Sequence, residues 1–293
     1  MVRCRSPDGD GGYPGSVQAR VTYTLAAGTQ REGQTPAQPL PTLRICMEAS
    51  AQACTPVNMV QHTHWNLSGS QRVSQVTYMH TRNCFDAIPY QKMHQIRCWP
   101  LLQGQTVGAH ELRLIGASHY TPVDDTLIPT GEVVAVAGTP LDFTQSPMRL
   151  DPRLRELADG IDHNFVIAAE ASGAHGGSGS GGGGAAMEAG GMRPVEQGTV
   201  PVAELRDPES GRGLELSSNA PGLQVYTGNF LEGAPGKAGV VYCQHQSICL
   251  ESQTFPNSVN VAAFPSPFIR PEEVYRHRMD VRFLTFGLEE EGV

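Results

Sequence analysis

Apolar and polar residues alternate along several short stretches of the chain, as they do in β-strands that bury one face. In residues 17–25 (VQARVTYTL) the odd positions are apolar or aromatic and mostly polar residues stand between them. Residues 43–48 and 111–115 repeat this pattern. Residues 201–205 and 213–216 repeat it on either side of seven turn-forming residues (RDPESGR), which predicts a β-hairpin.

Helical periodicity is nearly absent from the sequence. Only residues 152–158 (PRLRELA) sustain it, for about two turns before Gly160. The chain also contains 33 Gly and 22 Pro among 293 residues, and only 17% of its residues are charged. Many short strands joined by Gly- and Pro-rich turns predict an all-β sandwich or barrel with few short helices.

Three stretches interrupt the strand pattern of what we interpret as a single domain over residues 1–293. Residues 28–41 are polar and Pro-rich, which predicts a surface loop between two strands. Residues 171–191 include GGSGSGGGG and bury too little apolar surface to offset their ordering entropy, so we expect a mobile loop. Residues 71–104 have no clean period, and we interpret them as an insertion.

The net charge and the number of cysteines exclude several kinds of partner and indicate the cellular compartment. A net charge of −8 without a basic cluster argues against nucleic acid or an anionic membrane as a partner. The longest apolar runs have the length of strands, and residues 1–30 show no apolar core of a signal peptide. Seven cysteines spread along the chain favour reduced thiols over a disulfide framework. We therefore expect a cytoplasmic protein, and a monomer.

Five segments carry a more specific signal. They are residues 55–69, with TPVN followed by QHTHWNLSG; 120–132 (YTPVDDTLIPTGE); 160–165 (GIDHNF); 221–231 (PGLQVYTGNFL); and 249–275, with CLESQ, Pro256, Asn260 and RPEEVY. The opening residues 6–15 (SPDGDGGYPG) add a sixth. Each segment alone is weak, but in this order they closely resemble the aldose 1-epimerase (galactose mutarotase) family. The resemblance implies a large β-supersandwich and a reaction, without metal or cofactor, that interconverts the α and β anomers of a free aldohexose such as galactose or glucose.

The implied chemistry explains the residue types. A base must remove the proton of the anomeric hydroxyl while an acid protonates the ring oxygen, so a carboxylate and an imidazole should stand on opposite sides of the C1–O5 edge. The resemblance assigns Glu251 as the general base and His62 as the general acid. It assigns Asp162 and Gln224 to the ring hydroxyls, and leaves His163 and Asn164 as scaffold.

Each assignment has a plainer alternative. Glu251 could be an exposed residue of an alternating strand, and Gln224 could be one on the solvent face. Asp162 could cap a turn, and His62 could be a surface or hydrogen-bonded core histidine. His64 competes with His62 for the role of acid, although it stands where the family usually has an aromatic residue.

Other chemistry has little support in the pattern. His80 and Cys84, like His94 and Cys98, have a spacing that suits zinc, but no knuckle-like turn lies between the pairs, so we predict no metal site.

The chain also departs from the family pattern. Gln61 stands where the family has Asn before the acid histidine. The Asn-Arg and His-Gly-Gly segments of the family, whose Arg and His contact the sugar, do not occur, so we expect that the first part of the domain is missing. Residues 71–104 break the pattern between matching segments, which suggests either a retained intron or a surface insertion; reads of the transcript that continue through this stretch would retire the intron hypothesis.

Three alternatives to an epimerase of free sugars stay open. The missing sugar contacts favour a sugar-binding relative without turnover, or a truncated product without function. A hexose-6-phosphate 1-epimerase would need Arg or Lys near its site, and the motif segments contain neither before Arg270.

Overall fold

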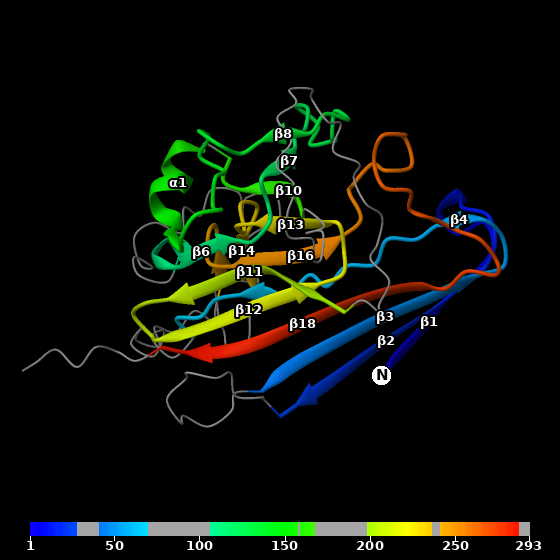
Figure 1. The fold of residues 1–293 in the computed structure, drawn as a ribbon, viewed down its shortest axis with the longest axis horizontal. Coiled ribbons are helices and arrows are strands. Elements are labelled where there is room, and N and C mark those ends of the chain that lie inside the picture. Colours follow the sequence, from blue (N-terminus) through cyan, green and yellow to red (C-terminus); the bar gives the residue numbers. More distant parts are fainter. Residues whose placement is uncertain (28–40, 70–105, 158, 168–197, 236–240, 287–293) are drawn as a thin grey trace, which may run out of the picture.

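The computed structural model describes residues 1–27, 41–69, 106–157, 159–167, 198–235 and 241–286. Within these residues the regular structure is mostly antiparallel β-sheet, and two large sheets dominate it (Figure 1). Helical structure is limited there to α1 (Leu150–Glu156) and two short 3-10 turns, η1 (Asp10–Gly12) and η4 (Val107–Ala109). The predicted all-β class with few short helices is confirmed.

The larger sheet has eight strands in the described part of the chain. In spatial order they are β1 (Val2–Ser6), β2 (Val17–Ala26), β3 (Thr42–Ala51), β18 (Tyr275–Thr285), β12 (Arg212–Ser218), β11 (Val200–Asp207), β6 (Glu111–Leu114) and β9 (Met148–Arg149). β18 lies between β3 and β12, so the last described strand joins the N-terminal strands to the middle of the sheet (Figure 1).

The smaller sheet has six strands among the described residues, in the order β5 (His64–Trp65), β16 (Ile248–Gln253), β13 (Gly222–Tyr226), β10 (Asp162–Val166), β7 (His119–Thr121) and β8 (Val134–Ala135). Two short ladders accompany it. β14 (Glu232–Pro235) pairs with β15 (Val241–Cys243), and β17 (Phe268–Ile269) pairs with β4 (Thr55–Pro56).

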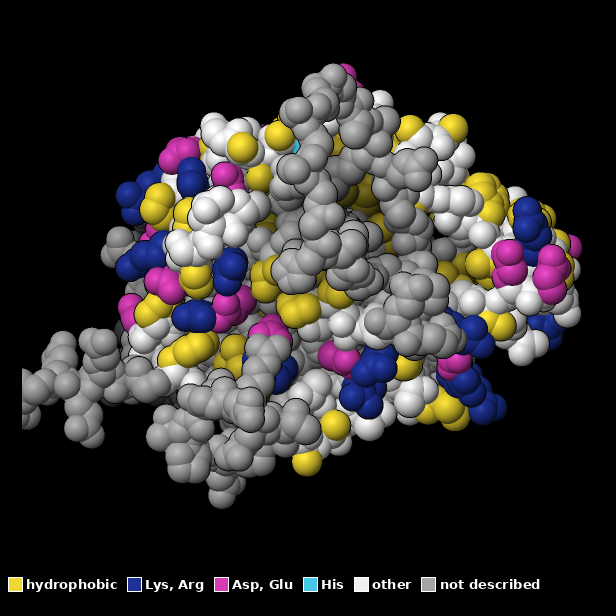
Figure 2. Space-filling view, viewed as in Figure 1, with side chains coloured by type: hydrophobic (Ala, Val, Ile, Leu, Met, Phe, Trp, Pro, Cys, Tyr) yellow, Lys and Arg dark blue, Asp and Glu magenta, His cyan; other side chains and the backbone are white. Residues whose placement is uncertain are grey.

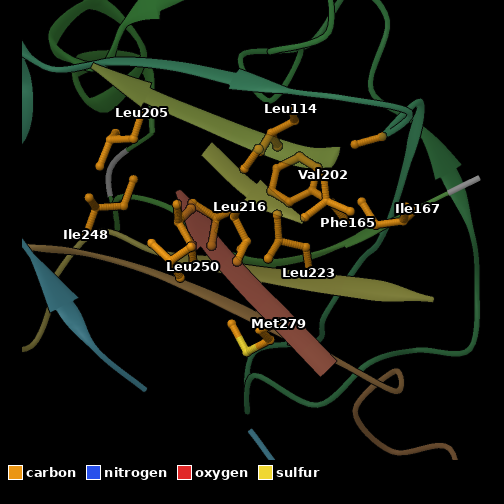
Figure 3. Packing of buried hydrophobic residues seen from close by; sticks show 14 of the residues in the cluster. Leu114, Phe165, Ile167, Val202, Leu205, Leu216, Leu223, Ile248, Leu250 and Met279 are labelled. Carbon is orange, nitrogen blue, oxygen red and sulfur yellow. The ribbon is translucent and has the colours of Figure 1, made fainter. Parts of the chain in front are cut away.

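The core fills the space between the two sheets (Figure 3). Large side chains of the eight-stranded sheet meet those of the six-stranded sheet there, all at most 2% exposed: Leu205, Leu216 and Met279 from the former, and Phe165, Leu223 and Leu250 from the latter. The free energy of transferring such side chains out of water is about 1.5–3 kcal/mol each. The smaller sheet is therefore held from one side, and its other face is available for polar chemistry.

Charged residues cover the outer face of the larger sheet in cross-strand pairs. Arg20 lies opposite Glu48, and Arg44 lies opposite Asp280, at a distance of 3.2 Å between Arg44 Nε and Asp280 Oδ1. Arg and acidic side chains accordingly stand beside one another over β2, β3 and β18 (Figure 2). Such pairs contribute about 0.2–1 kcal/mol each and keep this face hydrated.

Several expectations lie outside the described residues. These are the Gly-rich loop at 171–191, the insertion at 71–104 with His80, Cys84, His94 and Cys98, and the loop at 28–41 apart from Pro41. The described segments contain no helix with the length and apolar character needed to cross a bilayer. Cys4, Cys46, Cys54 and Cys249 are free thiols. Cys243 is disulfide-bonded, so the expectation of reduced thiols is wrong for that residue.

Candidate active site

A pocket of about 570 Å³ lies on the face of the smaller sheet that points away from the core. Side chains alternate along its central strands, so Phe165, Leu223 and Leu250 face the core while their neighbours Asn164, Gln224 and Glu251 face the pocket. The volume is in the range of small-molecule sites. The polar lining residues are His62, His64, Thr121, Asp162, Asn164, Gln224, Glu251 and Gln253, and the apolar ones are Val123, Leu127, Pro129, Tyr226, Phe230, Leu231 and Pro256.

Strand register arranges these side chains in two rows across the sheet. One row runs Thr121, Asn164, Gln224 and Glu251, each the Cα partner of the next. The other runs Asp162, Tyr226, Cys249 and His64. Residues that are far apart in sequence therefore become neighbours because five antiparallel strands present the same face.

Glu251 is a buried carboxylate in the middle strand of the site, with 6% of its surface exposed. The alternative of an exposed strand residue is thus wrong. Burial raises its pKa because desolvation penalises the charged form, and the nearby Asp162 acts in the same direction, whereas His62 opposes it. A carboxyl whose pKa is raised toward neutrality is suited to accept a proton and return it.

His62 contacts Glu251, with 3.2 Å between its Nε2 and Glu251 Oε1. Its side chain is 51% exposed and stacks on His64, with 5.0 Å between ring centroids. The acid and the base were expected on opposite sides of a sugar edge, but in this structure they touch. His62 is about half exposed, so rotation of its side chain would break this contact and open space between the two groups.

The segment that carries His62 is anchored to the scaffold on its N-terminal side. Asn58 exchanges two hydrogen bonds of 3.0 Å with the backbone of Thr254, three residues after Glu251. Gln61, the residue before His62, donates to the Thr63 hydroxyl and accepts from the Tyr23 hydroxyl. These hydrogen bonds fix the beginning of the segment, whereas the His62 imidazole itself contacts Glu251 and His64.

Asp162 and Gln224 form a hydrogen-bonded pair on the pocket face. Gln224 Nε2 donates to Asp162 Oδ1 at 2.7 Å, and Gln253 Nε2 approaches Gln224 Oε1 at 3.4 Å. The structure therefore brings all four predicted site residues into one pocket. The carboxylate and amide groups offer acceptors and donors for hydroxyl groups.

Some pocket residues were not predicted as ligands. Asn164 was assigned to the scaffold, but it lines the pocket and is 2% exposed, and its Oδ1 has no hydrogen-bond partner among the described residues. The sequence offered one signal for this: Asn164 lies two residues after Asp162, and residues two apart on a strand share a face. Tyr226 and Phe230 stack on each other at 6.2 Å and form an aromatic wall. His163, in contrast, lies against Tyr120 and is absent from the pocket lining.

A buried histidine connects the strands beneath the site. His277 on β18 is 1% exposed; its Nδ1 lies 3.0 Å from the Met59 carbonyl and its Nε2 lies 2.8 Å from Ser252 Oγ. It therefore joins the segment before His62 to the strand that carries Glu251. Burial lowers the pKa of His277 from 6.5 to about 4, so it is neutral in the folded protein.

We expect this histidine to make folding stability depend on pH. Because the unfolded state binds the proton more tightly, stability is complete above pH 6.5 and falls as the pH drops toward 4, by about 2 kcal/mol at pH 5. Urea unfolding at pH 7.5 and pH 5, compared between the parent chain and His277→Gln, measures it. The loss should shrink in His277→Gln and persist in the control His119→Gln, at a half-buried histidine of β7; equal losses in all three proteins would contradict the assignment.

Comparison with known proteins places this pocket in a family. A family model described as aldose 1-epimerase matches residues 98–282. The chain belongs to the aldose 1-epimerase family. It is 34% identical over 274 residues to galactose mutarotase from Sus scrofa, and 34% identical over 280 residues to that from Homo sapiens. It is 26% identical over 285 residues to aldose 1-epimerase from Escherichia coli K12.

These alignments cover 93–95% of this chain and 59–62% of the relatives, so the chain spans about three-fifths of the length of the aldose 1-epimerases it matches. Solved structures agree in fold. A GalM/aldose epimerase homologue from C. elegans superposes with a TM-score of 0.67 at 22% identity, covering 97% of this chain and 65% of that one. Galactose 1-epimerase from Lactobacillus acidophilus NCFM gives 0.61 at 21% identity, covering 97% and 62%.

Proposed function

We propose that this chain is an aldose 1-epimerase that interconverts the α and β anomers of a free aldohexose such as galactose or glucose. The observation that carries the proposal is the contact between His62 and the buried Glu251 in a pocket also lined by Asp162 and Gln224. Family membership and the names of the relatives, galactose mutarotase and aldose 1-epimerase, support the same reaction.

The proposed reaction needs only two proton transfers. Glu251, as a carboxylate, takes the proton of the anomeric hydroxyl, and protonated His62 donates a proton to the ring oxygen as the C1–O5 bond breaks. The open-chain aldehyde then rotates about C1–C2. Ring closure reverses both transfers, since neutral His62 takes the proton of the attacking hydroxyl and the Glu251 acid returns its proton to O1. Such acid–base assistance typically contributes about 10²–10⁴-fold to a rate.

The remaining polar groups are proposed to hold the sugar during this rotation. Asp162 accepts hydrogen bonds from ring hydroxyls, and Gln224, already bonded to Asp162, offers a donor and an acceptor. The apolar Tyr226 and Phe230 provide a wall for the C–H face of the ring. Since none of the described residues lining the pocket is Arg or Lys, a free sugar fits better than a phosphorylated one.

Polarimetry on freshly dissolved α-D-galactose tests the proposal. We expect the chain to accelerate the approach to anomeric equilibrium and the rate to fall on acidification, because protonated Glu251 is inactive as a base. Its pKa is raised, so the acidic limb should have its midpoint above 4.5, the ordinary value of a Glu carboxyl.

Two results would argue against this assignment. A midpoint at or below the ordinary carboxyl value would remove Glu251 as the base. A folded chain that binds galactose without accelerating mutarotation would instead be a sugar-binding relative.

A further inference from the structure

Three side chains with affinity for transition metals meet at one wall of the pocket. His62, His64 and Cys249 each offer one ligand atom, and these atoms all lie within 4.8 Å of one another. Register explains the cluster, since His64 on β5 is the Cα partner of Cys249 on β16, and His62 stacks on His64. Two imidazoles and a thiol are the ligand types found in zinc sites.

His64 is already oriented as a ligand. Its Nδ1 is hydrogen-bonded to Ser247 Oγ at 2.8 Å, which leaves Nε2 for a metal ion. Metal-binding histidines commonly bond to an outer partner through the other ring nitrogen, which fixes the orientation of the ring. Ser247 therefore fixes the orientation of the His64 ring in the same way.

Cys249 supplies the softest atom of the cluster. It is a free thiol with no exposed surface, opposite His64 in the strand register, and it has no part in the proposed acid–base reaction. Burial and the nearby Glu251 raise its pKa to about 12, so the thiol is neutral while no cation is present. A bound metal ion would lower that pKa and release the proton.

We infer that His62, His64 and Cys249 form a binding site for a divalent transition metal ion such as Zn²⁺, and that occupation of this site inhibits the enzyme. Binding forms one metal–sulfur and two metal–nitrogen bonds and releases the Cys249 proton to solvent. The fourth position is open to the Glu251 carboxylate or to water. The inhibitory half of the inference rests on the proposed function, because it requires that His62 act as the acid.

The adjustment needed to bind the ion is small. Zinc–nitrogen distances of about 2.0–2.1 Å and a zinc–sulfur distance of about 2.3 Å place tetrahedral ligand atoms about 3.5 Å apart. The present spacing of at most 4.8 Å exceeds this by at most about 1.3 Å. His62 is half exposed and can supply this movement. Since the same imidazole is needed for proton transfer, sugar turnover and the metal ion compete for it.

Cobalt(II) absorption measures binding directly and without any enzyme assay. We expect the full chain, titrated with Co²⁺ under reducing conditions, to develop a thiolate-to-cobalt charge-transfer band and the visible bands of tetrahedral cobalt. Zn²⁺ should displace the cobalt. The bands should be lost in Cys249→Ala and in His64→Phe, and retained in the matched control Cys46→Ala, whose thiol lies on β3.

Polarimetry then measures the consequence. Zn²⁺ should inhibit mutarotation by the parent chain and by Cys46→Ala, and chelation should reverse the inhibition. Measured against its own metal-free rate, Cys249→Ala should need at least about tenfold more Zn²⁺ for half inhibition, since even outer partners of metal ligands change affinity by about 10–100-fold.

The outcomes separate the site from the proposed function. Absence of the charge-transfer band in the folded parent chain, or its persistence in Cys249→Ala, overturns the metal site. If the bands behave as expected while none of the proteins accelerates mutarotation, the site stands and the proposed function fails. Bands as expected with mutarotation that is insensitive to Zn²⁺ overturn the inhibitory role.

Discussion

Replacement of Glu251 by glutamine is expected to reduce mutarotation by about 10²–10⁴-fold, the contribution usual for a general base. Glutamine keeps the shape of the side chain but takes no proton at neutral pH, so the anomeric hydroxyl loses its acceptor. The initial rate of change in optical rotation of α-D-galactose, corrected for the uncatalysed rate, measures the effect.

Two controls test whether the loss of rate comes from the missing carboxylate of Glu251 itself. Glu156→Gln changes an exposed carboxylate on α1, outside the pocket, and should leave the rate unchanged. The unfolding midpoint of Glu251→Gln should stay close to that of the parent chain, which separates lost chemistry from lost structure. A Glu251→Gln protein with more than about a tenth of the parent rate would assign the base to another group.

Truncation of Phe165 to alanine is expected to lower the free energy of unfolding by about 3–5 kcal/mol, the usual cost of removing a buried phenyl ring. Phe165 has no exposed surface and belongs to the cluster between the two sheets (Figure 3). Its strand neighbour Asn164 faces the pocket. Urea unfolding measures the loss; the control Phe268→Ala, at a side chain 46% exposed, should cost less than about 1 kcal/mol. Equal costs at both positions would mean that the space between the sheets does not supply the main core.

The alternation of apolar and polar residues predicted the strands well where one face is buried and the other is exposed to solvent. The expected strands at 17–25, 43–48 and 111–115 correspond to β2, β3 and β6, with ends that differ by at most three residues. The expected hairpin is present, but its turn is shorter than predicted. Arg206 and Asp207 extend β11, with Arg206 paired to Gly213 and Asp207 to Arg212 across the ladder. Polar residues at a strand end resemble turn residues until the pairing is known.

The helix at 152–158 was placed two residues too late. It begins at Leu150, so Pro152 is its third residue. Proline is tolerated in a first helical turn because the amide groups there lack a partner within the helix. The fully buried Leu150 fixes the beginning by tertiary packing, which local sequence does not encode.

The four predicted site residues came from motifs, and the rest of the site depends on register. Glu251, His62, Asp162 and Gln224 line one pocket, as the resemblance implied. Asn164 and Tyr226 join the pocket only because of how β10, β13 and β16 are aligned. A shift of one residue in any of these strands would turn their side chains to the other face, and the sequence alone does not state the alignment.

The arrangement of the site in two rows across paired strands has a consequence for folding. Neither row exists until four strands that are distant in sequence have paired, so the capacity to bind sugar should arise only with the cooperative native state. A sugar that binds only that state, as proposed above, will slow the hydrogen exchange of the central strands by a factor that grows with its concentration relative to its Kd. Amide protection in β10, β13 and β16 thereby becomes a measure of affinity that requires no turnover at all.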